Sequence, residues 1–247
     1  MKPPQPKKIP KIHTAHGDER IDDYYWLRDD TRKNPEVISY LEAENKYLES
    51  WFESKNDCRK EIYDELVSFI PPHEVSMKVK YGDYYYFSEI SSDQQYKTYY
   101  REINGNKELV LDVNELAKDL DYFNVASIAP SPNNHYIAYA EDLSGRREYN
   151  IKIKNLETGQ IIDKSIQRSS GSVVWNKNND TIYYALKDPV TLIENKVFKH
   201  KVGTDTKEDI LIYEEKDTEF HLHIFESRTK KYLCLLYTSD AADEQDR

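Results

Sequence analysis

The chain carries an internal repeat, Pro130-Ser-Pro-Asn-Asn-His-Tyr-Ile-Ala-Tyr-Ala140, which returns 45 residues later as Trp175-Asn-Lys-Asn-Asn-Asp-Thr-Ile-Tyr-Tyr-Ala185. The two copies agree at both asparagines, the isoleucine, the last tyrosine and the final alanine. In each copy an asparagine-rich turn precedes a strand, a charged loop and a further strand, at 151–156 and 197–202. Four strands repeating about every 45 to 50 residues are typical of β-propeller blades. A β-sandwich whose turns match by coincidence is the alternative interpretation.

Short strands rich in tyrosine extend this pattern from about residue 77 onward. Alternating side chains predict strands at 83–90, 95–103 and 108–112, and weaker echoes of the repeat lie at 80–87 and 229–233. Aromatic and β-branched residues favour a pleated, half-buried surface. The sequence therefore predicts a mainly β fold, an incomplete β-propeller, preceded by an α-helical arm.

Residues 1–75 are predicted to form that arm, an extended segment followed by two helices. Asn34 suits the N-cap of the first helix and Pro35 its first position, where the missing N–H costs nothing. The second helix is predicted over 62–70, after a polar link at 55–57, and Pro71-Pro72 ends it. Three- and four-residue spacing marks one apolar face of the first helix. Its residues are Val37, Tyr40, Leu41, Tyr47, Leu48, Trp51 and Phe52.

The seven glycines exclude several kinds of site. The nearest pair, Gly159 and Gly171, is 12 positions apart. A dinucleotide fingerprint, a P-loop and a G-x-S-x-G nucleophile elbow each need two or more glycines within a few residues. The two cysteines, Cys58 and Cys234, are too few for a cysteine-rich zinc site. We therefore expect no cofactor and no metal.

Charge and hydropathy exclude two classes of partner. The chain has 35 basic and 45 acidic residues, a net charge of −10 with the signs intermixed, whereas a nucleic-acid binder shows a basic face. No apolar run approaches the ~20 residues of a membrane span. The N-terminus has no apolar core segment of a secretory signal, and the low cysteine count fits a reducing compartment. We expect a cytoplasmic protein that binds neither nucleic acid nor membrane.

Several motifs resemble one branch of a known family. The segment His16-Gly-Asp-Glu-Arg-Ile-Asp-Asp-Tyr-Tyr-Trp-Leu-Arg-Asp-Asp30 closely resembles the N-terminal signature of oligopeptidase B, the trypsin-like branch of the prolyl oligopeptidase family of serine peptidases. The resemblance runs in order from about residue 8 to 233. Further matches are Ile70-Pro-Pro-His-Glu-Val-Ser76, Ala140-Glu-Asp-Leu-Ser-Gly-Arg-Arg-Glu-Tyr149 and Lys187-Asp-Pro-Val-Thr-Leu192.

This resemblance implies an enzyme in two parts. A seven-bladed propeller would cap an α/β-hydrolase domain that holds the Ser-Asp-His triad and acidic pockets for Arg or Lys, and residues 1–75 would pack on that domain. The propeller would admit short basic peptides and exclude folded proteins. The chain would supply the arm and about three of seven blades (76–233), with no catalytic residue, so we expect it to be inactive alone. A free-standing propeller that binds partners, or part of a post-proline-cleaving enzyme, are the alternatives.

The family pattern breaks in the middle of a predicted strand. The string Cys234-Leu-Leu-Tyr-Thr-Ser-Asp-Ala-Ala-Asp-Glu244 resembles the translation of a sequencing-library adapter. We expect residues 234–247 to lie outside the natural protein. A natural acidic tail is the alternative.

Three charged residues are candidates for a latch between domains. Arg146 and Arg147 lie in a predicted loop between blade strands, and Glu74 follows the arm. A rim arginine paired with an acid near the domain boundary would help to hold a closed state. The alternative is an ordinary exposed charge run worth ~0–1 kcal/mol.

His221 and His223 alternate along a strand, but no third ligand is evident, so we expect no metal there.

Overall fold

The computed structural model describes residues 2–239, and the chain divides into two units between Pro71 and Pro72. The division falls just before the predicted boundary at 75/76, because His73–Val75 form a strand that pairs with the first sheet of the second unit. Each unit is described by itself.

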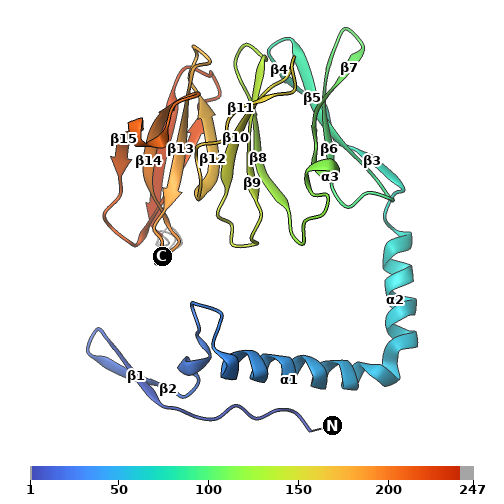
Figure 1. Cartoon of the computed structure of the whole chain (residues 1–247), viewed down its shortest axis with the longest axis vertical. Helices are drawn as coiled ribbons and strands as arrows, with labels where there is room; N and C mark the ends of the chain where they lie inside the picture. The colour runs from blue at the N-terminus through green and yellow to red at the C-terminus, as the bar shows by residue number, and fades with distance from the viewer. Residues whose placement is uncertain (1, 240–247) are drawn as a thin grey trace, which may run out of the picture. The chain divides into compact units, whose positions relative to one another are not determined.

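The first unit contains a hairpin and two helices (Figure 1). The hairpin pairs β1 (Lys11–Ala15) with β2 (Asp18–Asp22), and a 3-10 turn, η1 (Tyr25–Leu27), follows it. The helix α1 (Pro35–Phe52) begins as predicted, since the Asn34 side chain accepts a hydrogen bond from the Glu36 N–H at 3.0 Å. The predicted polar link at 55–57 is wrong: a 3-10 turn, η2 (Glu53–Lys55), leads directly into α2 (Asn56–Ser68). The acid Asp57 suits that first helical turn, where the helix dipole favours negative charge.

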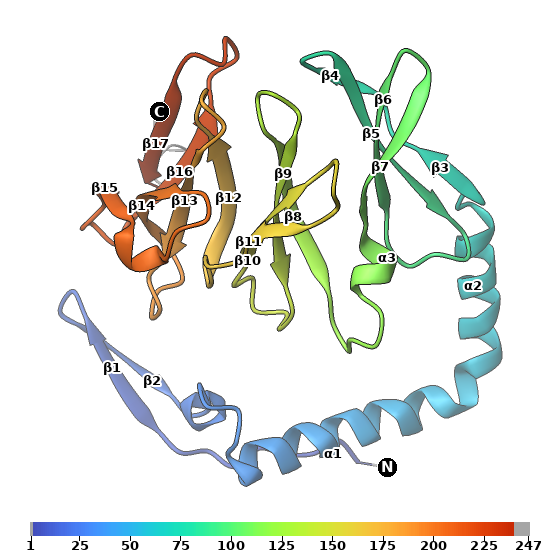
Figure 2. The same cartoon turned by 45° about the horizontal axis from the view of Figure 1, so that its top comes forward.

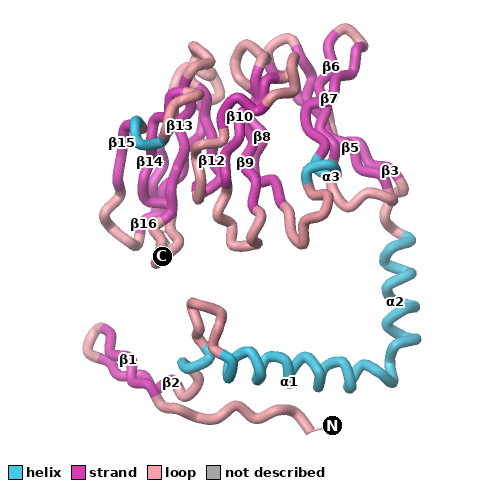
Figure 3. Tube along the Cα trace, viewed as in Figure 1, coloured by secondary structure: helices cyan, strands magenta, loops and turns pink. Residues whose placement is uncertain are grey.

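The second unit is a succession of antiparallel sheets, which Figure 3 shows as magenta strands. In the first sheet β3 (His73–Val75) and β4 (Val79–Tyr81) both pair with β5 (Tyr84–Ser91), followed by β6 (Thr98–Ile103) and β7 (Asn106–Asp112). A short helix, α3 (Val113–Leu116), follows β7. The second sheet contains β8 (Asn124–Pro130), β9 (Tyr136–Asp142), β10 (Asn150–Asn155) and β11 (Ile161–Asp163).

The third sheet contains β12 (Ser169–Trp175), β13 (Thr181–Lys187), β14 (Glu194–Lys201) and β15 (Ile210–Glu214), with η3 (Thr206–Glu208) before the last strand. A hairpin of β16 (Phe220–Glu226) and β17 (Leu233–Ser239) begins a fourth sheet. The four sheets stand side by side in both views (Figures 1 and 2). We call them blades 1 to 4, because sheets packed face to face in sequence order form a propeller and not a two-layer sandwich.

Three buried clusters fill the spaces between successive blades. Strand β9 contributes to two of them, because its side chains alternate between its two faces. Ile137 and Tyr139 pack towards blade 1, whereas Ala138 and Ala140 pack towards blade 3. The second copy of the repeat packs in the same way in blade 3. Ile182 and Tyr184 face the preceding blade 2, and Ala185 faces the following blade 4. The matched isoleucines, tyrosines and alanines of the repeat are therefore equivalent in packing.

The predicted boundary at 233/234 falls inside a strand. Cys234 pairs with Phe225, and β17 continues to Ser239. The rest of the expected tail, residues 240–247, lies outside the described residues.

Candidate domain-interface site

Each blade turns back and forth between two rims, because its strands are antiparallel. On one rim the first strand of each blade begins and the connections between blades run. This rim also contains the turns between the second and third strands, at 92–97, 143–149 and 188–193. We call this the start rim. The far rim holds the turns that follow the first strands, at 82–83, 131–135, 176–180 and 227–232. Neighbouring blades therefore present their loops together on each rim.

The three predicted latch residues lie on the start rim. Glu74 is an exposed residue of β3, opposite Ile90, and Arg146 and Arg147 lie in the turn 143–149 of blade 2. The topology thus places them on one rim in adjacent blades. No salt bridge joins Glu74 to either arginine in the part of the chain that the structure describes.

A buried carboxylate fixes the turn that carries the two arginines. Asp142, fully buried at the end of β9, accepts hydrogen bonds from the Ser144 N–H (2.8 Å) and hydroxyl (2.9 Å), the Gly145 N–H (3.1 Å) and the Arg147 N–H (2.8 Å). Burial alone would raise the pKa of Asp142, but these hydrogen bonds outweigh it and lower the pKa. The carboxylate stays ionised and rigidly shapes the turn.

Blade 3 and the connection that leads into it hold the same turn through two further side chains. The Lys187 ammonium donates a hydrogen bond to the Arg147 carbonyl at 3.1 Å, and Arg168 forms a salt bridge of 3.1 Å with Glu148. Arg147 itself has a φ of +59°. Both backbone polar groups of Arg147 are thus bonded within the fold.

The side chains of the two arginines are exposed to solvent. Arg146 and Arg147 are exposed, and within residues 2–239 neither side chain has a hydrogen-bond or salt-bridge partner. Guanidinium is always charged and bonds carboxylates in a two-pronged geometry. A fixed turn presenting two such groups can dock an acidic side chain of another domain. The pattern Asp142-Leu-Ser-Gly145 was the available sequence signal for this turn, since aspartate followed by Ser-Gly favours turns.

The two histidines of β16 lie on the same strand, as predicted. His223 Nδ1 is 3.7 Å from the carboxylate of Glu194, and this carboxylate has a buried oxygen without a hydrogen-bond partner in the described chain. Burial raises the pKa of Glu194. No group of three or more potential metal ligands occurs among residues 2–239.

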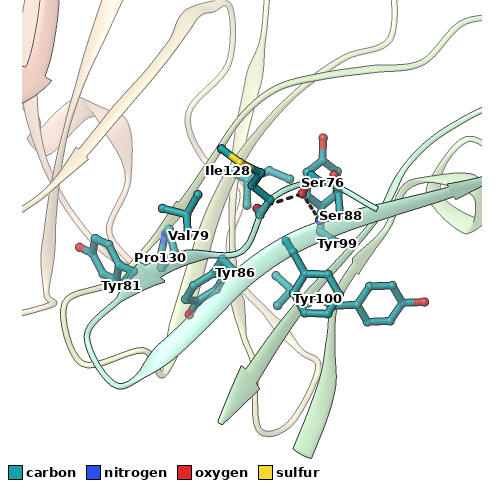
Figure 4. Close-up of a pocket in the computed structure, with 12 residues that line it drawn as sticks. Ser76, Val79, Tyr81, Tyr86, Ser88, Tyr99, Tyr100, Ile128 and Pro130 are labelled. Atoms are coloured by element: carbon teal, nitrogen blue, oxygen red, sulfur yellow. Dashed lines mark hydrogen bonds between the residues drawn. The ribbon is translucent and has the colours of Figure 1, made fainter. Parts of the chain in front are cut away.

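A pocket of about 300 Å³ lies beside the broken first strand of blade 1 (Figure 4). The break at 76–78 separates β3 from β4, and Ser76 bridges it by donating its N–H to the Ser88 carbonyl at 2.9 Å while its Oγ accepts the Ser88 N–H at 2.9 Å. Aromatic and aliphatic side chains form most of the lining, including Tyr86, Tyr100 and Ile128. No charged side chain lines it, so its walls offer apolar contact and two serines.

No helix in the described part of the chain is both long and apolar enough to cross a membrane.

The fold defines a class of protein: a β-propeller segment preceded by a helical arm. The family model of the prolyl oligopeptidase N-terminal β-propeller domain matches residues 3–245. The chain belongs to the prolyl oligopeptidase family.

Two curated relatives support this assignment. The chain is 34% identical over 261 residues to dipeptidyl aminopeptidase BI of Pseudoxanthomonas mexicana, and 35% identical over 258 residues to Protease 2 of Moraxella lacunata. These alignments cover 98% and 99% of the chain but 36% of each relative. The chain therefore spans about a third of the length of these relatives.

Solved structures show the same arrangement of elements. The chain resembles oligopeptidase B from Leishmania major with a TM-score of 0.89 and 28% identity, over 96% of this chain and 36% of that one. The closed form of oligopeptidase B from Trypanosoma brucei gives a TM-score of 0.86 at 28% identity, with the same coverage. The family model also runs through the expected adapter segment to residue 245, so the adapter origin of residues 234–247 stays a prediction.

Proposed function

We propose that this chain is the N-terminal, propeller-side part of an oligopeptidase B-like serine endopeptidase that cleaves short peptides after Arg or Lys. The observation that carries the proposal is the match to oligopeptidase B over 96% of this chain at a TM-score of 0.89. The chain covers only 36% of that structure, so the proposal assigns the catalytic serine, aspartate and histidine to a domain beyond this sequence. The chain alone is inactive and, in this proposal, cytoplasmic.

In the proposal the propeller limits access to the active site. Blades packed through continuous buried clusters form a rigid wall, which admits a short extended peptide more easily than a folded protein. The missing catalytic domain is the partner in cis, and short basic peptides are the substrates of the whole enzyme. Neither nucleic acid nor membrane is a partner in this proposal.

A second candidate function is removal of dipeptides from a peptide N-terminus. The 34% identity to a protein named dipeptidyl aminopeptidase favours it. Prolyl endopeptidase activity has less support, since the relative of that name from Elizabethkingia miricola is 24% identical. A free-standing binding module is a further alternative, which predicts a genuine stop codon near codon 233.

Sequencing the gene beyond codon 233 and assaying the complete protein would test these alternatives. The proposal expects further blades, a G-x-S-x-G element, and cleavage of internally placed Arg or Lys in N-terminally blocked peptides. Cleavage of unblocked peptides only would favour the dipeptidyl function, and cleavage after proline would contradict the proposed specificity. A stop codon at the end of the propeller segment would favour the binding module.

The latch is tested in the complete enzyme by Arg147→Glu. Because an exposed ion pair contributes at most ~1 kcal/mol, we expect kcat/KM for a basic peptide to change measurably, by no more than about fivefold. The matched control is Arg228→Glu, which changes another exposed arginine, in the far-rim turn 227–232. Unchanged kinetics for Arg147→Glu, or an equal change in the control, would reject the latch.

A further inference from the structure

His200 lies on β14 between two carboxylates and has no exposed surface. Its Nε2 is 2.8 Å from Asp163 Oδ2, and its Nδ1 is 2.6 Å from Asp209 Oδ1. Asp163 ends β11 of blade 2, whereas Asp209 follows η3 in blade 3. The imidazole therefore bridges the outer part of two neighbouring blades.

Both carboxylates are acceptors of further hydrogen bonds. Asp163 accepts from the Ser165 N–H (2.9 Å) and hydroxyl (2.7 Å) and from the Gly203 N–H (2.5 Å). Asp209 accepts from the Tyr184 hydroxyl at 2.7 Å. A carboxylate surrounded by donors is held ionised and has no proton to give to an imidazole nitrogen. Each ring nitrogen of His200 must then be the donor, and only the imidazolium has two N–H groups.

Electrostatics support the same protonation state. Burial would lower the pKa of His200, but the hydrogen bonds and charges of Asp163 and Asp209 outweigh it and raise the pKa. Burial would likewise raise the pKa of Asp163, but hydrogen bonds from His200, Ser165 and Gly203 reverse the effect and lower it. Burial, followed by the bond to Asp209, raises the pKa of the Tyr184 phenol, which therefore stays a donor.

We propose that His200 is a clasp between blades 2 and 3 that is protonated at neutral pH and weakens when the imidazolium loses its proton at alkaline pH. Deprotonation would leave one nitrogen lone pair facing a carboxylate oxygen in a buried site, so one hydrogen bond would become a repulsion. The clasp is not a catalytic pair, because the ring has no surface that a substrate could reach.

The sign of the pH dependence follows from the raised pKa. The contribution of His200 to stability is fully present below the ordinary histidine pKa of about 6.5 and is lost as pH rises through the higher pKa of the folded chain. The groups that face the ring are Asp163, Asp209 and, through Asp209, Tyr184. The pKa of Asp163 is lowered, so this carboxylate stays ionised in this range, and the raised pKa of Tyr184 keeps its phenol protonated; the change therefore belongs to His200.

Nitrogen NMR on the complete chain with ¹⁵N-labelled histidine tests the protonation state. We expect both ring nitrogens of His200 to be protonated at pH 8, and the exposed His135 serves as the surface histidine for comparison. Asp209→Asn, which keeps an acceptor for Tyr184, should shift the His200 titration to lower pH. A neutral His200 at pH 7, or a titration point that Asp209→Asn leaves unchanged, would overturn the proposal.

Chemical unfolding between pH 6 and pH 10 tests the clasp. The loss of stability on raising pH should be smaller in His200→Gln than in the wild type, with His135→Gln as the control that keeps the wild-type slope. If His200→Gln does not fold, Asp209→Asn takes its place, because it should move the same loss to lower pH. An identical pH dependence in the wild type and the folded variants would overturn the clasp.

Discussion

At the scale of single residues, two buried carboxylates fix the positions of charged groups by accepting hydrogen bonds. Asp142 shapes the arginine turn on the start rim, and Asp163 anchors His200 at the junction of two blades. Each carboxylate accepts several N–H or O–H bonds, which stabilise its charge and fix the donors in space. The exposed Arg146 and Arg147 depend on this framework for their position.

Asp142→Asn tests the framework directly. The amide carries no charge and presents one acceptor oxygen, so we expect a loss of about 1–3 kcal/mol and faster amide exchange in the turn 143–149. The pKa of Asp142 is lowered in the fold, so its contribution is present above the unfolded value of about 3.8 and disappears as pH falls through the folded value.

Hydrogen-exchange mass spectrometry of the turn, compared at neutral and acidic pH, measures this loss. The control is Asp93→Asn, an exposed aspartate in the start-rim turn 92–97. Equal protection of 143–149 in the wild type and Asp142→Asn would contradict the prediction.

At the scale of elements, the asparagine turns of the repeat join successive blades. The second asparagine of each pair has a left-handed backbone, with φ of +59° at Asn134 and +65° at Asn179. Asn134 Oδ1 accepts a hydrogen bond from the Tyr86 hydroxyl of blade 1, and Asn179 Oδ1 accepts one from the Asn133 N–H of blade 2, both at 2.8 Å. Gly82 and Lys230 have positive φ in the corresponding turns of blades 1 and 4, where the weaker echoes were predicted.

Substitutions at Asn179 separate the two roles of this residue. Asn179→Gly keeps the backbone conformation and loses the inter-blade bond, which should cost about 0.5–1.5 kcal/mol. Asn179→Ala should cost ~1–2 kcal/mol more, because a side chain with a Cβ is strained in the left-handed region. Asn178→Ala, at the exposed first asparagine, is the control. Thermal or chemical unfolding measures the stability of the three variants. If Asn179→Ala were as stable as Asn179→Gly, the predicted backbone strain would be wrong.

At the scale of the whole molecule, the arm exposes apolar surface. On α1, Leu41 is 52% and Trp51 is 49% exposed, and beyond α2 Phe69 is 73% exposed. Large apolar side chains exposed in this number mark a surface that packs against a partner. The predicted partner is the catalytic domain of the complete enzyme.

We therefore predict that this chain on its own self-associates or is loosely packed. Replacing Trp51 and Phe69 together by serine should reduce self-association and the binding of a hydrophobic dye, because less apolar area is exposed. Sedimentation velocity and dye fluorescence measure both effects. Replacing the surface threonines Thr31 and Thr229 by serine is the control. A sharp, cooperative melt from a wild-type monomer would count against the prediction.

Much of the fold could be predicted from periodicity and turn residues, because these act locally. The repeat located the blades, and Asn34 with Pro35 located the start of α1. The prediction of a polar link at 55–57 was wrong, because a short polar segment is compatible with either a loop or the start of a helix. The clasp around His200 was missed because Asp163 is 37 residues from it, and no local spacing records such a contact.

The sequence by itself determined the blades, the helical arm and the family, because strand alternation, capping residues and motif order are written along the chain. Only the tertiary structure decided which polar groups meet: it left Glu74 unpaired with Arg146 and Arg147 in the described chain, and it joined His200 to two carboxylates. The physical reason is that packing of one blade on the next sets which side chains lose water together. Away from water, a missing hydrogen bond or an unpaired charge costs much free energy of folding. On the surface, the same pair contributes little.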